Sequence, residues 1–117
     1  MKKINELSYE IKKSKFIGYM YEVLSEDEVN TILTSLKSMH KNAKRFPYAY
    51  KLVNTARKTD DKEPSNTAGT PILKALERKN LTNTLIVIVR YFGGTKLGAG
   101  PLLRSYAKVA NDLVNSL

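Results

Sequence analysis

Apolar and polar residues alternate along the first quarter of the chain, and this pattern predicts two β-strands. They span Leu7–Ile11 and Lys15–Val23, and the second is rich in aromatic and β-branched residues. The polar Lys12-Lys13-Ser14 between them suits a tight turn. We therefore predict an N-terminal β-hairpin.

A helix is predicted next, from Ser25 to the region of His40–Ala43. Ser25 is a good N-cap, and Glu28 stands three residues later, where a capping box places it. Apolar residues then recur at the 3.6-residue helical period from Val29 to Met39. The helix should present one apolar face to a core.

The rest of the chain continues to alternate between strand and helix patterns. Pro47–Asn54 reads as a short strand, and the polar stretch Thr55–Asn66 as a loop, part of which could instead pair as an edge strand. Helices are expected to begin at Thr70-Pro71 and at Pro101, because proline suits the first helical turn. Between them, Leu85–Val89 is apolar on both faces and indicates a central strand. The order ββαβαβα predicts an α+β fold, which we expect to be a two-layer sandwich.

Length and composition limit what the chain can be. Its 117 residues are enough for one core, so we expect a single domain over residues 1–117. The absence of cysteine excludes disulfides, zinc–thiolate sites and thiol chemistry. The longest apolar run, Leu85–Val89, is far shorter than the roughly 20 residues of a membrane helix, and no signal peptide is visible. We expect a cytoplasmic protein that does not associate with membranes.

The charge is strongly positive and unevenly placed. The formal net charge is +9, and no acidic residue occurs between Val29 and Thr59. From Pro64 to Asn111 the only acid is Glu77. Such an excess attracts phosphate backbones, acidic protein surfaces or anionic membranes. The alternative is that the lysines serve solubility alone.

The segment Tyr91–Gly100 is the strongest candidate for a binding loop. Four of its residues are glycines, and it leads from a buried strand to a helix N-terminus, with Lys96 among the glycines. Exposed amides and the helix dipole make this a competent anion site, whereas the alternative is a tight corner without a ligand. The glycine spacing does not match the dinucleotide-binding motif. A phosphate-binding P-loop also fails, because Ala99-Gly100 stands where Lys-Ser/Thr is required.

A second cluster lies at Asp60–Pro71, with three carboxylates in four residues. These could bind a divalent cation or cap the following helix. A metal cage draws its ligands from separate places, so we favour capping and predict no metal site. Catalysis has few candidates, because His40 is the sole histidine and is expected on the helix surface. Tyr48, Tyr50 and Tyr91 could stack nucleic-acid bases or simply fill a core.

Several blocks of sequence resemble one protein family in order and spacing. They are Lys13–Ile17, Tyr48–Tyr50, Asp61–Leu73, Arg90–Gly98 and Leu103–Tyr106. Together these blocks resemble the IMPACT family, the YigZ-like proteins, across nearly the whole chain. The Glu63-Pro64 and Tyr91-Phe92-Gly93-Gly94 blocks are the most specific.

The resemblance implies a left-handed β-α-β crossover like that of a ribosomal small-subunit protein. It also relates the fold, by analogy, to the GHMP kinases, which bind phosphate at a glycine-rich helix start. Eukaryotic members are regulators that bind the activator of an amino-acid-starvation kinase, and bacterial members have been viewed as nucleic-acid or ribosome-associated proteins. This chain departs from the family at Lys62, Asn66 and Pro101, where glycine is common, and at Arg45, where histidine is usual. We expect the core domain alone, without the second domains of bacterial or eukaryotic members.

Our leading hypothesis is a non-catalytic regulatory module that acts near translation and binds RNA or ribosomes. The alternatives are a protein–protein regulator of a translation-stress pathway and a phosphate-ligand enzyme of GHMP type. No cofactor is predicted, and the oligomeric state stays open. The anion or nucleic-acid site is predicted at Arg57, Lys58, Arg90, Tyr91, Gly93, Gly94, Lys96, Gly98 and Arg104. The motif loop contributes Asp61, Glu63, Pro64, Ser65, Thr67 and Gly69.

Overall fold

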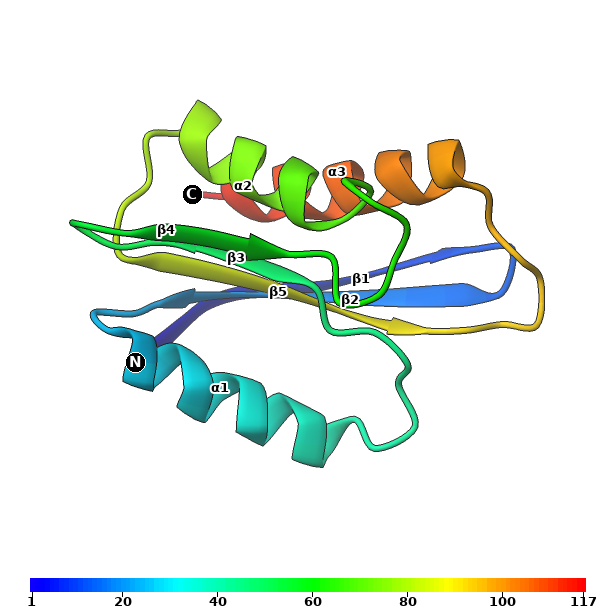
Figure 1. Cartoon of the computed structure of the whole chain (residues 1–117), viewed down its shortest axis with the longest axis horizontal. Helices are drawn as coiled ribbons and strands as arrows, with labels where there is room; N and C mark the ends of the chain where they lie inside the picture. The colour runs from blue at the N-terminus through cyan, green and yellow to red at the C-terminus, as the bar shows by residue number, and fades with distance from the viewer.

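One antiparallel sheet of five strands runs through the middle of the molecule, with helices on both faces (Figure 1). The computed structural model describes residues 1–117, and the strand order is β1-β2-β5-β3-β4. The elements are β1 (Lys2–Ile11), β2 (Ser14–Glu22), α1 (Glu26–Met39), β3 (Tyr48–Lys51), β4 (Ala56–Thr59), α2 (Gly69–Arg78), β5 (Thr84–Tyr91) and α3 (Ala99–Asn115).

The N-terminal hairpin is confirmed and is longer than the sequence pattern predicted. Pairing runs from Lys2 opposite Glu22 to Ile11 opposite Ser14. Between the strands, Lys12 and Lys13 both have positive φ, 47° and 67°, as a two-residue turn between twisted strands requires. The extra residues of β1 lie at an exposed sheet edge, where polar side chains give no apolar pattern.

The predicted central strand is confirmed as β5. It pairs with β2 on one side and with β3 on the other, both antiparallel. Successive side chains of a strand point to opposite faces, so an apolar strand needs cover on both. Leu85, Val87 and Val89 contribute to one core cluster, and Ile86 and Ile88 to the other.

The helices divide between these two clusters, so the domain has three layers. Val29, Ile32 and Leu36 of α1 pack in one cluster, whereas α2 and α3 pack in the other, on the opposite face (Figure 1). The α+β class is confirmed, but the expected two-layer arrangement is wrong. The reason is β5 itself: with apolar residues on both faces, it would expose half of them in a two-layer sandwich.

The start of α1 follows the predicted capping pattern with one difference. Ser25 Oγ accepts from the backbone N–H of Glu28 at 3.2 Å. The Glu28 carboxylate accepts from the N–H of Leu24 at 2.9 Å, one residue before the N-cap. None of the three helices is long and apolar enough to cross a membrane.

The element order is ββαββαβα, with one strand more than predicted. Strand β4 pairs with β3 in part of the segment Thr55–Asn66, so the alternative of an edge strand there is the correct one. Its Arg57 and Lys58 are exposed, and such charged edge strands carry no apolar alternation.

The topology contains two β-α-β crossovers of opposite hand. Strands β2 and β3 are parallel and joined through α1, while β4 and β5 are parallel and joined through α2, each pair being separated by one strand. The two connections run in opposite directions across the sheet between oppositely directed strands, and their helices cover opposite faces. One crossover is therefore left-handed, against the usual right-handed rule, as the resemblance implied.

Candidate functional site: a basic pocket between two motif loops

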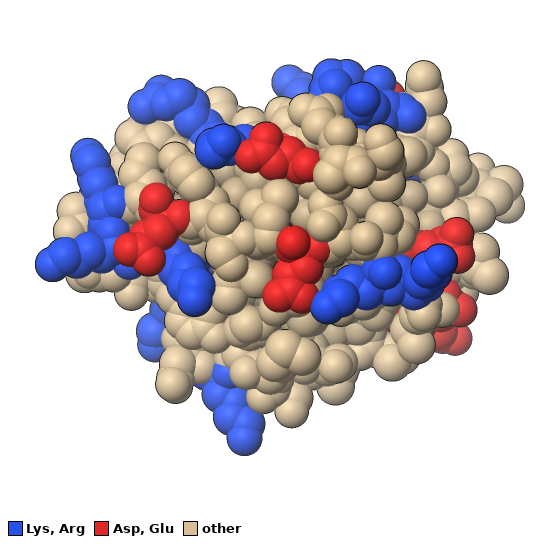
Figure 2. Space-filling model, turned by 180° about the vertical axis from the view of Figure 1, so that it is seen from behind, with Lys and Arg blue, Asp and Glu red and all other residues tan.

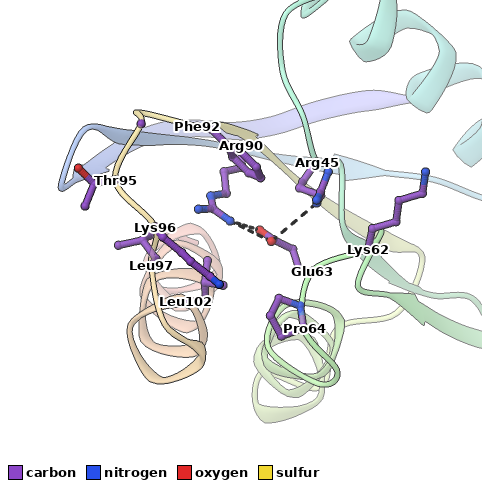
Figure 3. A pocket seen from close by; sticks show the side chains of 11 residues that line it. Arg45, Lys62, Glu63, Pro64, Arg90, Phe92, Thr95, Lys96, Leu97 and Leu102 are labelled. Carbon is purple, nitrogen blue, oxygen red and sulfur yellow. Dashed lines mark hydrogen bonds and ion pairs between the residues drawn. The ribbon is translucent and has the colours of Figure 1, made fainter.

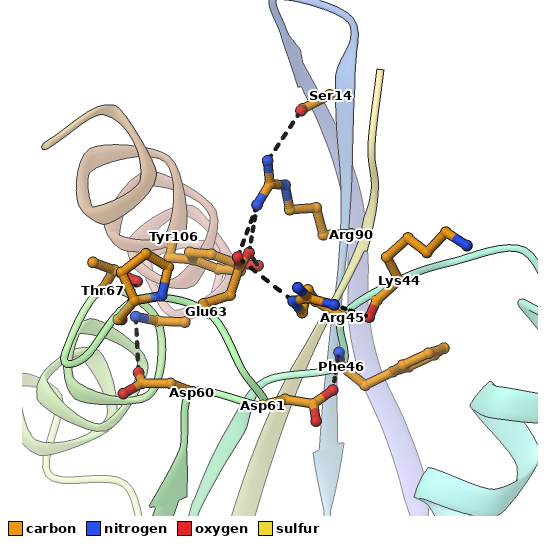
Figure 4. Close-up of polar contacts among 12 residues, drawn as sticks. Ser14, Lys44, Arg45, Phe46, Asp60, Asp61, Glu63, Thr67, Arg90 and Tyr106 are labelled. Atoms are coloured by element: carbon orange, nitrogen blue, oxygen red, sulfur yellow. Dashed lines mark hydrogen bonds and ion pairs between the residues drawn. The ribbon is translucent and has the colours of Figure 1, made fainter. Parts of the chain in front are cut away.

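The loop between β4 and α2 is folded by its own acidic side chains. Asp60 accepts from the backbone N–H groups of Ala68 at 3.1 Å and Gly69 at 2.8 Å, which caps the start of α2. Asp61 accepts from the N–H of Phe46 at 2.7 Å. The predicted capping role is thus confirmed, and the carboxylates turn to separate partners (Figure 4).

The third carboxylate of the loop, that of Glu63, is buried in an ionic cluster. Arg90 Nη1 donates to both of its oxygens, at 2.9 and 2.7 Å, and the Tyr106 hydroxyl donates at 2.5 Å. Arg45 Nε lies 3.8 Å from the same carboxylate. A buried charge is tolerated only when it is paired and hydrogen-bonded in this way. We call these four residues the Glu63 cluster (Figure 4).

Arg90 reaches this cluster because it follows the alternation of β5 and projects to the α2/α3 side. Its guanidinium lies 4.3 Å from the ring centroid of Phe92 and 5.6 Å from that of Phe16, and Nη2 donates to Ser14 Oγ at 3.4 Å. Burial and the adjacent Glu63 carboxylate raise the pKa of Tyr106, so its hydroxyl stays protonated and remains a donor.

A pocket of about 400 Å³ opens directly over the Glu63 cluster (Figure 3). Its lining carries four cationic side chains and one carboxylate, an excess of three positive charges. Arg45 and Arg90 turn toward Glu63, while Lys62 extends away from it (Figure 3). Neither Lys62 nor Lys96 forms an ion pair with the protein. The pocket is lined by Arg45, Lys62, Glu63, Pro64, Arg90, Phe92, Gly94, Thr95, Lys96, Leu97 and Leu102.

The glycine-rich loop forms the second wall of the pocket. At Gly93 a side chain is impossible without movement, because a Cβ would lie 1.9 Å from the carbonyl oxygen of Lys13 in the hairpin turn. Gly94 has a φ of +86°, in the region that favours glycine. Gly98 is extended and precedes α3, as its N-cap. The two motif loops, distant in sequence, therefore meet at one pocket.

The structure separates the other predicted site residues from this pocket. Arg57 lies on β4 and pairs with Glu26 at 3.8 Å, and Lys58 Nζ donates to Thr70 Oγ1 at 2.9 Å. Arg104 lines a different groove, between α3 and the hairpin. Tyr91 projects to the opposite face of the sheet.

Among the motif-loop residues, several serve the loop itself. Ser65 is exposed. The Thr67 hydroxyl donates to the carbonyl of Pro64, at 2.6 Å, and the N–H of Gly69 donates to Asp60. Glu63 and Pro64 are the two that line the pocket.

Several residues of the site were not among the candidates, chiefly Arg45, Lys62, Phe92 and Tyr106. Arg45 had a signal, because it stands at a position where the resemblance places histidine. It is held next to the site by a β-bridge to Arg90. Phe92 belongs to the predicted glycine-rich loop but was given no role of its own. Tyr106 was assigned to the buried face of the last helix, and only the packing of α3 against the sheet brings it to Glu63.

His40 is buried, which corrects the expectation of a solvated surface histidine. Its Nε2 is 2.7 Å from the Tyr19 hydroxyl and its Nδ1 is 2.6 Å from the Tyr91 hydroxyl. Burial lowers the pKa of His40, so the ring stays neutral near pH 7 and bridges the two tyrosines. Tyr50 likewise lies in the core, where its hydroxyl donates to Glu26.

The face of the molecule seen from behind carries no single continuous patch of positive charge (Figure 2). On the face seen from behind, basic side chains gather in separate groups toward the rim, with acidic groups between them (Figure 2). The pocket is distinguished from these surfaces because two of its four cations are held in a fixed, buried arrangement by Glu63.

The structure is that of a small α+β domain with two crossovers of opposite hand and a basic pocket between two motif loops. The Impact N-terminal domain profile matches residues 12–114. The chain belongs to the IMPACT family, and the resemblance seen in its sequence blocks is confirmed.

Individual relatives give the same result. A Bacillus subtilis protein, IMPACT family member YvyE, is 38% identical over all of this chain and 55% of its own length. The crystal structure of a hypothetical protein matches with a TM-score of 0.91 and 29% identity, covering 96% of this chain and 57% of the other. The two-domain translational regulator Yih1 matches with a TM-score of 0.53 and 21% identity, over 92% of this chain and 46% of the other. That last likeness concerns the fold, and the chain spans about half the length of these relatives.

Proposed function

We propose that this domain is a non-catalytic regulatory module linked to translation, and that it binds RNA, free or within the ribosome, through the basic pocket. Membership of the IMPACT family and the fold shared with a translational regulator support the link to translation. The pocket supplies the chemical basis for the RNA contact.

The observation that carries the proposal is the charge of the pocket. Arg45 and Arg90 share the single Glu63 carboxylate, and Lys62 and Lys96 at its rim have no acidic partner. Exposed cations without partners gain most from a phosphate, whose binding also releases counterions from the nucleic acid. The pocket therefore favours a phosphate-bearing ligand over an acidic surface of low charge density.

The same geometry favours binding over chemistry. Glu63, the only carboxylate in the pocket, already accepts hydrogen bonds from Arg90 and Tyr106. A general base needs a free lone pair aimed at its substrate. His40 faces the other side of the sheet, held between Tyr19 and Tyr91.

A salt series tests the proposal. The wild-type protein should bind RNA or ribosomes at about 50 mM salt, and log K should fall linearly with log salt. A Lys62→Gln/Lys96→Gln variant should bind roughly 10-fold more weakly, with a salt slope shallower by about one to two units. The matched control is Lys2→Gln/Lys79→Gln, which removes the same charge at the start of β1 and the end of α2. Absence of binding at about 50 mM salt would overturn the proposal.

A second candidate is protein–protein regulation, favoured by a groove between α2 and α3. Its lining includes Lys74, Arg78 and the exposed Leu103, a combination suited to an acidic amphipathic helix. Pull-down from nuclease-treated lysate separates the two functions, because a protein partner survives nuclease. Loss of that partner in a Leu103→Gln variant, with RNA binding unchanged, would establish this second surface.

A further inference from the structure

Phe92 stands out as an aromatic side chain left half exposed inside a charged pocket. The residue is 48% exposed, although the chain otherwise buries most of its aromatic rings. It lines the pocket together with the buried Leu97 and Leu102. Exposure of an aromatic ring to water costs hydrophobic free energy. A ring left exposed in the same pocket as the unpaired Lys62 and Lys96 is therefore a candidate contact for a ligand.

The ring is held in place from within the protein. The guanidiniums of Arg90 and Arg45 lie 4.3 and 5.1 Å from its centroid. The Nε atoms of both arginines are buried and have no hydrogen-bond acceptor, which suits guanidiniums that stack on an aromatic ring. Glu63 fixes the two arginines in turn. The Phe92 ring and the two arginines are therefore held in place before any ligand binds.

We propose that the pocket takes a single unpaired nucleotide of an RNA strand, with its base stacked on Phe92 and its phosphates next to Lys96 and Lys62. This inference rests on the proposed RNA-binding function and narrows it to single-stranded RNA. A planar base fits a pocket of about 400 Å³ that has apolar walls and cations at its rim. In a duplex, both faces of each base are covered by its neighbours, so a duplex cannot use the ring.

The same chemistry, a base joined to a phosphate, is also present in a free nucleotide. The strand is the favoured source because the charge extends beyond one phosphate. Lys62 and Lys96 belong to the two opposite loops of the pocket, and Lys62 extends away from Glu63 (Figure 3). Two cations placed apart suit successive phosphates of a strand that passes across the pocket.

Fluorescence anisotropy with labelled RNA tests the inference. The probes are a single-stranded oligoribonucleotide of roughly 12 nucleotides, the duplex of the same sequence and a free mononucleotide as competitor. The wild-type protein should prefer the single strand. Phe92→Leu keeps an apolar side chain over Arg90 but cannot stack, and should weaken single-strand binding roughly 10- to 100-fold. Phe92→Tyr should retain the wild-type affinity.

Two controls make the result specific. Val53→Ala removes apolar surface from another exposed site. It should leave the affinities for single-stranded RNA and for the duplex unchanged. A thermal melt of Phe92→Leu tests whether the variant is still folded. Its binding of the duplex should also persist, because a duplex does not use the ring. Equal binding of single strand and duplex, or no effect of Phe92→Leu, would overturn this inference while leaving the RNA-binding proposal standing. Tight binding of the mononucleotide without any strand preference would also overturn it.

Discussion

Arg90 and Tyr91 are neighbours at the end of β5, yet they join two very different buried polar clusters. Arg90 points to the α2/α3 face and enters the Glu63 cluster, which is charged. Tyr91 points to the α1 face and binds His40, which Tyr19 contacts from the other side. This second group, the His40 cluster, is neutral.

The contrast shows how one strand can serve two purposes. The His40 cluster ties the C-cap of α1 to the sheet through two hydroxyl groups and lines none of the pockets. The Glu63 cluster holds two arginines in place at the base of the basic pocket. Burying charge is costly unless every partner is present, so the charged cluster should be the more fragile of the two.

The largest expected effect comes from neutralising Glu63. Glu63→Gln leaves Arg90 buried without a counter-charge, and removal of one partner from a buried ion pair costs about 3–5 kcal/mol. Urea or guanidinium unfolding measures the loss. The control, Glu10→Gln, is an exposed substitution of the same kind and should change stability by less than about 0.5 kcal/mol. Equal losses of unfolding free energy in the two variants would mean that the charge of Glu63 contributes little to stability.

A matched pair of tyrosine substitutions compares the clusters directly. Tyr106→Phe removes a hydrogen bond to a carboxylate, worth about 1.5–3 kcal/mol. Tyr19→Phe removes one to a neutral imidazole, worth about 0.5–1.5 kcal/mol. Denaturant midpoints at pH 7.5 or so, where His40 is neutral, should therefore rank Tyr106→Phe as the more destabilised variant. The reverse order would mean that the tyrosine hydroxyl stabilises the His40 cluster more than the Glu63 cluster.

The pH dependence of stability isolates the neutral cluster, because His40 is the only histidine of the chain. Burial lowers its pKa in the folded state, whereas an unfolded histidine titrates near its ordinary pKa of 6.5. The folded state then binds fewer protons, so stability is full above the unfolded pKa and falls as pH drops through it toward the folded pKa. The slope cannot exceed about 1.4 kcal/mol per pH unit for one proton. His40→Gln should abolish this slope between about pH 7.5 and 5.5, and a slope that persisted would point to another group.

The smallest effect concerns the backbone that carries Glu63. Lys62 has a φ of 72°, a conformation that costs a non-glycine residue about 1–2 kcal/mol. Lys62→Gly should therefore stabilise the protein, by about 0.5–1 kcal/mol after the added flexibility of the unfolded chain is subtracted. Lys79→Gly is the control, because Lys79 has an ordinary φ of −96° and should lose stability. Thermal denaturation distinguishes the two signs, and a loss in both variants would show that the Glu63 loop is unstrained.

Local patterns along the chain predicted most of the elements. Alternation predicted the hairpin, the continuous apolar run predicted β5, and the 3.6-residue period predicted α1. The edge strand β4 was predicted only as an alternative to a loop, because an exposed polar edge gives no period. The three layers were not predicted, because the layer count depends on which face each helix covers. The capping role of the Asp60 loop was predicted, since acids before a helix start have a local function.

The candidate site was predicted only in part. The motifs are local in the sequence, whereas the surface that residues share depends on contacts between distant segments. The glycine-rich loop and Glu63-Pro64 were recognised as motifs, and both line the pocket. Arg57, Lys58 and Arg104 were grouped with them by charge, but the fold places them elsewhere. Charge alone does not tell which surface a lysine or arginine will share.

The sequence by itself determined the α+β class, the family and the two loops that matter, because these depend on short-range patterns and on blocks that can be compared directly. Only the tertiary structure decided that Arg90 and Tyr91 would part to opposite faces and meet Glu63 and His40. Those partners lie 27 and 51 residues away, and nothing in the local pattern marks such pairs. The loop between β4 and α2 on one face of the sheet, and the end of α1 on the other, brought these pairs together.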